Sequence, residues 1–105
     1  MSAMADVPGE QKREVDYLLE YVAQTDCTII RNGTRHDADE AVSHIQQKYE
    51  YFRDRIDSTE SFIEYAASRS TLSGRDYQVD CPGQAIQTTS QWLRDALSAY
   101  RAQQP

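Results

Sequence analysis

Positive charge is scarce in this chain, because 11 lysines and arginines face 17 aspartates and glutamates and leave a net charge of −6. Binding to nucleic acid or to an anionic membrane surface needs a basic stripe, and none is visible. Long apolar runs are missing too, since no stretch approaches the roughly 18 residues of a membrane span. With 105 residues and 39% hydrophobic content, the chain is expected to form one small core, with neither nucleic acid nor a membrane span among its interactions.

The chain begins Met1-Ser2-Ala3-Met4-Ala5-Asp6, which contains neither the basic nor the apolar segment of a signal peptide. Its doubled start, with a second methionine three residues after the first, is typical of a cloning remnant. We therefore expect residues 1–8 to be a disordered lead or such a remnant, and residues 9–105 to form a single helical domain.

Cysteine is also rare, and Cys27 and Cys81 leave two interpretations open. They are either buried free thiols or the two halves of a disulfide. A disulfide would close a loop of about 55 residues and contribute about 4 kcal/mol in the chain-entropy model. Two cysteines form no metal site alone, and His36 and His44 lie about two helical turns apart, too far for one ion. Neither a metal nor a cofactor is expected.

Hydrophobic periodicity predicts a mainly α, compact four-helix domain. The predicted helices cover about 10–24, a segment that starts near Asp37 and carries its apolar stripe to Ile56, a short third segment after 57–60, and about 85–101. Asp37, with Glu40 three residues later, is a capping-box arrangement.

Two apolar fragments, Thr28–Ile30 and Tyr77–Asp80, predict a short two-stranded β pair next to the helices. If Cys27 bonds Cys81 and the fragments run antiparallel, Ile29 lies opposite Val79. The same register places Arg31 opposite Tyr77.

Three short motifs occur in order: Arg31-Asn32-Gly33, Glu40-Ala41-x-x-His44 and Ser73-Gly74-x-x-Tyr77. Together they resemble the YfeK-like family of small exported proteins of Gram-negative bacteria, most of them uncharacterised. The resemblance extends over roughly residues 14–97. It implies a periplasmic location with an export signal removed, and with it a disulfide between Cys27 and Cys81.

Glu40, His44 and Lys48 are spaced by four and line one edge of the predicted second helix. Three interpretations are open: a carboxylate that orients an imidazole base, ordinary pairing along a helix surface, or a structural histidine that bonds a loop carbonyl. The family resemblance favours the structural role. Serines 68, 70 and 73 lack a nucleophile elbow, so no catalytic residue is expected.

Two polar, glycine-containing loops, 31–37 and 68–76, are candidates for recognition, because loops on a rigid scaffold commonly carry binding residues. The predicted partner-binding residues are Arg31, Asn32, Arg35, His36, Arg69, Ser70, Arg75 and Tyr77. The four arginines would form a local positive patch with Tyr77 as an aromatic anchor. The alternative is that these arginines pair with nearby acids.

A small, acidic, exported and disulfide-linked chain is typical of a binding module rather than an enzyme. In these properties it is also similar, more loosely, to the immunity proteins of type VI-secreted cell-wall amidases. The leading hypothesis is a periplasmic immunity-type inhibitor whose protein partner is a peptidoglycan-degrading amidase effector. The alternatives are a housekeeping envelope protein that binds a small ligand or peptidoglycan fragment, and a small hydrolase that uses Glu40 and His44. A homodimer is also left open.

Overall fold

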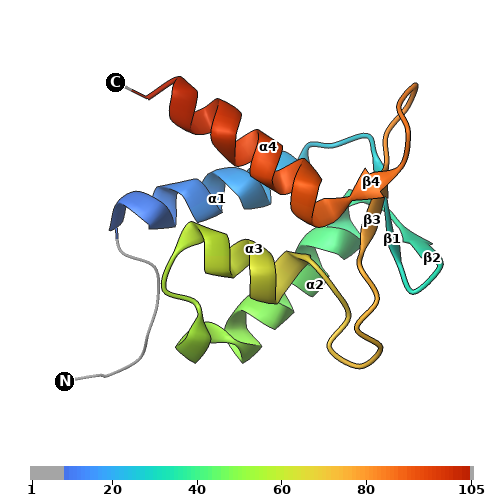
Figure 1. Cartoon of the computed structure of the whole chain (residues 1–105), viewed down its shortest axis with the longest axis horizontal. Helices are drawn as coiled ribbons and strands as arrows, with labels where there is room; N and C mark the ends of the chain where they lie inside the picture. The colour runs from blue at the N-terminus through green and yellow to red at the C-terminus, as the bar shows by residue number, and fades with distance from the viewer. Residues whose placement is uncertain (1–8, 105) are drawn as a thin grey trace.

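The computed structural model describes residues 9–104 as four α-helices packed beside a small antiparallel sheet (Figure 1). The lead predicted for residues 1–8 lies outside this range. In chain order the elements are α1 (Gly9–Ala23), β1 (Thr28–Arg31), β2 (Thr34–His36), α2 (Ala38–Tyr51), the 3₁₀ turn η1 (Arg53–Arg55), α3 (Thr59–Ala67), β3 (Gln78–Asp80), β4 (Gln87–Thr88) and α4 (Thr89–Ala102).

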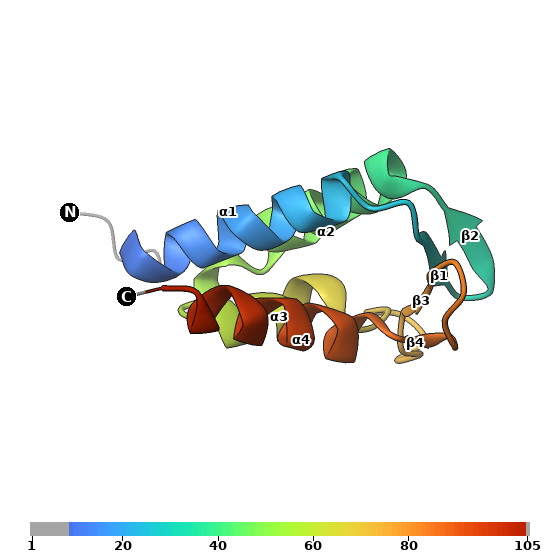
Figure 2. The ribbon, with the colours of Figure 1, turned by 90° about the horizontal axis from the view of Figure 1, so that it is seen from above.

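The helices form two layers, α1 with α2 and α3 with α4, and the sheet closes one end of both (Figure 2). Each helix turns an apolar stripe toward the space between the layers, as its periodicity predicts. The largest side chains with almost no exposed surface are Phe62, Leu18, Ile56, Ile63 and Leu93. The predicted mainly α, four-helix class is therefore confirmed.

Helix α2 begins as predicted and ends earlier than its apolar stripe suggested. The Asp37 side chain accepts a hydrogen bond from the Glu40 amide, and the Glu40 side chain accepts one from the Asp37 amide, which completes the capping box. The helix stops at Tyr51, and Ile56 enters the core from an extended segment after η1. Ile56 thus reaches the same core as the apolar stripe of α2, but from a separate segment of the chain.

The predicted strand pair is present as the centre of a larger sheet with the order β2-β1-β3-β4. Ile29 pairs with Val79, as expected from the sequence. Strand β2 returns from a two-residue turn at Asn32 and Gly33, whose φ angles of 51° and 81° suit a hairpin.

Strand β4 replaces what the sequence suggested was the first turn of the last helix. Gln87 pairs with Val79, and the Thr88 side chain accepts a hydrogen bond from the Gln91 amide, so α4 begins at Thr89 and not near 85. Ile86, which was expected on the apolar face of that helix, is 47% exposed. The apolar spacing near residue 85 could not predict strand β4, because its pairing partner β3 lies about ten residues earlier in the chain.

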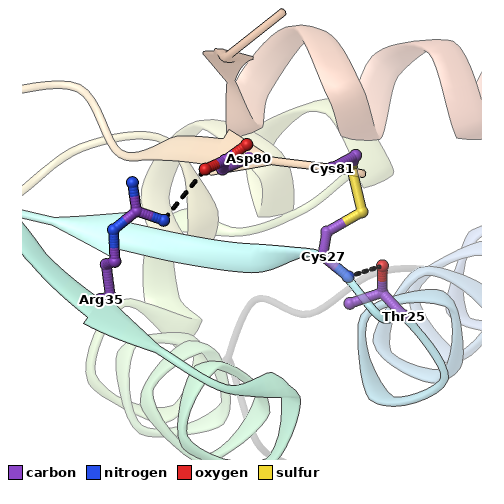
Figure 3. Close-up of a disulfide and its surroundings, with 5 residues drawn as sticks. All are labelled: Thr25, Cys27, Arg35, Asp80 and Cys81. Atoms are coloured by element: carbon purple, nitrogen blue, oxygen red, sulfur yellow. Dashed lines mark hydrogen bonds and ion pairs between the residues drawn. A yellow bond between two sulfur atoms is a disulfide. The ribbon is translucent and has the colours of Figure 1, made fainter. Parts of the chain in front are cut away.

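The disulfide predicted from the resemblance is present between Cys27 and Cys81. It lies directly beyond the Thr28–Asp80 pair, where β1 begins and β3 ends (Figure 3). Arg35 on β2 reaches across β1 to Asp80 with an N–O distance of 3.0 Å. The disulfide therefore joins the end of β3 to the segment that connects α1 with β1.

No helix within residues 9–104 is both long enough and apolar enough to cross a bilayer.

We expect the disulfide to provide a large share of the stability. Replacing Cys27 and Cys81 by serine should lower the free energy of unfolding by about 4 kcal/mol, because the unfolded chain regains the freedom of a long loop. Urea unfolding with and without dithiothreitol measures this. Reductant should move the wild-type midpoint and leave that of the double variant unchanged. A wild-type midpoint insensitive to reductant would contradict the stabilising role.

Candidate functional site

The structure brings the two predicted recognition loops together at the sheet end of the molecule. The Ser73 hydroxyl donates a 2.7 Å hydrogen bond to the Asn32 side-chain oxygen, which joins the loop 68–76 to the β1–β2 turn. Asn32 is able to present its side chain there because it occupies a left-handed turn position, which asparagine tolerates well.

The loop 68–76 is held by its own backbone rather than left open. Its base is fixed by an antiparallel bridge between Arg69 and Asp76. Above the bridge, the Ser70 amide donates to the Arg75 carbonyl at 2.9 Å and the Gly74 amide donates to the Ser70 carbonyl at 3.0 Å. Gly74 has a φ of +73°, a conformation that glycine adopts without strain. The segment is therefore a short, closed hairpin loop.

Leu72 lies at the tip of this loop and is 99% exposed. It is the single apolar residue between Ala67 and Tyr77. It is not among the partner-binding residues predicted from the sequence. The feature of the sequence that could have identified it is a single leucine within an otherwise polar, glycine-containing segment.

A cluster of four side chains lies beneath these loops, around His44. The Arg31 Nη1 atom lies 3.1 Å from His44 Nδ1, and the Tyr77 hydroxyl lies 3.0 Å from His44 Nε2. Lys48 Nζ donates to the Tyr77 hydroxyl at 3.3 Å and to the Arg69 carbonyl at 2.6 Å. The cluster thus links α2 to both β1 and the base of the loop 68–76.

The environment of His44 keeps its imidazole neutral. Burial, followed by the charges of Arg31 and Lys48, lowers the pKa of His44 to about 4. The Arg31 Nη1 atom lies almost equally close to both ring nitrogens, 3.1 Å from Nδ1 and 3.2 Å from Nε2. A guanidinium that can only donate hydrogen bonds disfavours the protonated ring there. Burial also lowers the pKa of Lys48 and raises that of Tyr77. The cluster is a structural hydrogen-bond network with two cations.

Glu40 does not orient His44. Its carboxylate lies 3.4 Å from His36 Nδ1 and caps the start of α2. The structural interpretation of His44 agrees with the geometry, although its partners are an arginine and a tyrosine side chain and not the loop carbonyl that was expected. Within residues 9–104, no group of three or more His, Cys, Asp or Glu side chains could hold a metal ion.

The predicted partner-binding residues divide into two groups. Tyr77 and Ser70 are buried, with 4% and 6% of their surfaces exposed, so their side chains offer almost no surface to a partner in this structure, and their assignment as contact residues stays a prediction. Tyr77 is buried because its ring closes the core over α2 and its hydroxyl joins the His44 cluster.

The arginines do not form the expected patch. Arg35 pairs with Asp80 and Arg69 pairs with Glu64, while Arg31 is directed to His44. Arg35 and Arg69 thus follow the alternative in which the arginines pair with nearby acids, whereas Arg31 does not. Among residues 9–104, the Arg75 side chain forms no ion pair, and Asn32, which bonds Ser73, is exposed in the joined loops.

Comparison with known proteins gives a family and no activity. The family described as "Family of unknown function (DUF5329)" matches residues 9–101. The chain is 38% identical over 78 residues to "Uncharacterized protein YfeK" of Salmonella typhimurium (strain LT2), a match that covers 73% of this chain and 65% of the relative's length. The predicted YfeK-like resemblance is confirmed. No solved structure matches the chain.

The depressed pKa of His44 predicts a pH dependence of stability. As the pH falls, the unfolded chain binds a proton at His44 before the folded chain does. The stability that the neutral His44 imidazole contributes is therefore complete above its unfolded pKa of about 6.5 and is lost as the pH falls through about 4. For a half-buried ring the loss should be on the order of 1 kcal/mol after solvent screening.

Urea unfolding between pH 7 and pH 4 measures this for the wild type, His44→Gln and the control His36→Gln. The His44→Gln variant should lose stability less steeply than the wild type as the pH falls. The control should keep a slope close to that of the wild type, because the charge of His36 is the smallest of the four causes that lower the pKa of His44. Equal slopes for the wild type and His44→Gln would contradict the neutral, donor-surrounded imidazole.

Proposed function

Because this chain belongs to the DUF5329 family, whose function is unknown, we propose its activity from its own geometry: it is a periplasmic immunity-type inhibitor that blocks a peptidoglycan-degrading amidase effector. One observation carries the proposal. A fully exposed leucine stands at the tip of a loop whose backbone is already closed and bonded to its neighbour.

A loop of this kind suits insertion into a concave partner site. An apolar side chain that fills a pocket at the centre of an interface contributes strongly to affinity, whereas in free solution it gains nothing from exposure. Because the bridge at Arg69 and Asp76 and the bond from Ser73 to Asn32 already fix the loop, binding loses little conformational entropy.

The rim of the loop is polar and offers contacts that fix its orientation. Thr71 and Ser73 flank Leu72, and the exposed Arg75 side chain lies on the same segment. An arginine without an internal ion pair is available for an acidic group at the mouth of a cleft. These residues take the place of the larger arginine patch expected from the sequence.

Other features favour inhibition over catalysis. A hydrolase that uses Glu40 and His44 lacks support, because the Glu40 carboxylate faces His36 and the imidazole of His44 faces two cations. A carboxylate beside the ring would be needed to stabilise the imidazolium that a general base forms. The disulfide supports an oxidising compartment such as the periplasm.

The proposal predicts that Leu72→Asp weakens inhibition at least tenfold. Burying a leucine contributes about 1.5–3 kcal/mol, which corresponds to roughly a tenfold to hundredfold change in affinity. The assay follows cleavage of purified peptidoglycan by the cognate Cys-His amidase, which is to be sought among the products of the neighbouring genes. The wild-type chain, titrated into the assay, should abolish cleavage near equal molar ratio.

The matched control is Tyr51→Asp, which removes another exposed apolar side chain, 79% exposed, at the end of α2. It should inhibit as the wild type does. Urea unfolding of both variants verifies that neither change affects the fold. Wild-type protein that leaves cleavage intact would reject the amidase as partner. Equal inhibition by the wild type and Leu72→Asp would place the interface elsewhere.

A further inference from the structure

A second surface, separate from the loop 68–76, lies between the C-terminal half of α1 and the middle of α4, from Trp92 to Ala99. It is a groove of about 740 Å³ whose end is formed by the disulfide and Pro82. Helices α1 and α4 contact each other, and both supply residues to its lining. The loop 68–76 and the His44 cluster contribute no residue to its lining.

Aromatic rings follow the groove in a continuous row. Tyr100 stacks on Tyr17 with ring centroids 4.4 Å apart, Tyr17 lies 6.1 Å from Tyr21, and Tyr21 lies 5.1 Å from Trp92. Tyr17, Tyr21 and Trp92 line the groove itself. The two tyrosines are only half-buried, so part of each side chain remains accessible to a ligand.

The charged residues of the lining all have the same sign. They are Glu20, Asp26 and Asp95, and no lysine or arginine occurs among the described residues that line the groove. None of the three carboxylates forms a salt bridge within residues 9–104. Glu20 and Asp95 accept hydrogen bonds only from the neutral amides of Gln24 and Gln91. Their negative charge is therefore not neutralised by the protein.

Carboxylates without counterions beside aromatic rings form a site for a cation. An arginine or lysine side chain is attracted to the face of a tryptophan or tyrosine ring, and an adjacent carboxylate pairs with its charged head. We infer that this groove binds an extended, arginine- or lysine-containing segment of a protein partner. Charge complementarity disfavours two other occupants: anionic cell-wall peptides, and a second copy of this chain, whose net charge is −6.

This binding site does not depend on the proposed inhibition, because it uses a different surface. The chain contains a single tryptophan, so its one indole N–H signal in a nitrogen-15 NMR spectrum reports the groove directly. The probe is an amidated hexapeptide of alternating arginine and glycine. Titration at low salt should give saturable shifts of the Trp92 indole and of the backbone amides around Glu20, Asp26 and Asp95.

The test variant combines Glu20→Gln, Asp26→Asn and Asp95→Asn. The control combines Glu10→Gln, Asp54→Asn and Asp76→Asn, which changes the net charge equally at exposed acids outside the groove lining. The groove variant should bind the peptide at least tenfold more weakly than the wild type, and the control should remain within about twofold of it. A hexapeptide with glutamate in place of arginine should cause no shift.

Three outcomes would overturn the inference. Equal weakening in both triple variants would mean that the peptide responds to net charge alone. Unchanged affinity in the groove variant would place the binding site elsewhere. A concentration-dependent shift of the Trp92 indole without peptide, with dimers in sedimentation velocity, would assign the groove to a second copy of the chain.

Discussion

The pairing of β1 with β3, held at one end by the Cys27–Cys81 bond, is the contact on which the rest of the structure depends. The pairing and its disulfide fix the segment that follows α1. Cys27 and Cys81 themselves belong to the lining of the aromatic groove. On the other side the pairing places the β1–β2 turn within reach of the loop 68–76. One covalent bond thus positions two separate surfaces, the aromatic groove and the joined loops. A core of this size supplies limited stability of its own, which is why such a bond matters.

Several parts of the fold followed from local sequence signals. The capping box at Asp37 and Glu40 marked the start of α2, and the apolar spacing in α1 and α3 identified the faces that are buried. The pairing of Ile29 with Val79 was also predictable, because one disulfide fixes the register of two adjacent strands. These features depend on residues that are neighbours in sequence or are joined by the cysteines.

The remaining features depend on tertiary contacts that no local pattern encodes. Ile86 is exposed because Gln87 and Thr88 pair with β3 instead of extending α4. Tyr77 carries a polar hydroxyl, yet it is buried, and its hydroxyl contacts His44 and Lys48, which are distant in sequence. Leu72 appeared to be one more loop residue until the loop's hydrogen bonds showed that it is held out at the tip. The sequence therefore predicted which loops form the candidate site. The contacts of the individual residues could be identified only in the structure.

The position of the two cysteines along the chain has a consequence for how the protein matures. Synthesis proceeds from the N-terminus, so Cys27 emerges 54 residues before its partner exists. During that interval its thiol has no correct partner. Because these 105 residues contain only two cysteines, they allow no wrong pairing among themselves, and a bond between two molecules is the error that crowding favours. Oxidation is therefore most accurate when newly made chains are dilute, and cross-linked dimers are the expected by-product of crowded production.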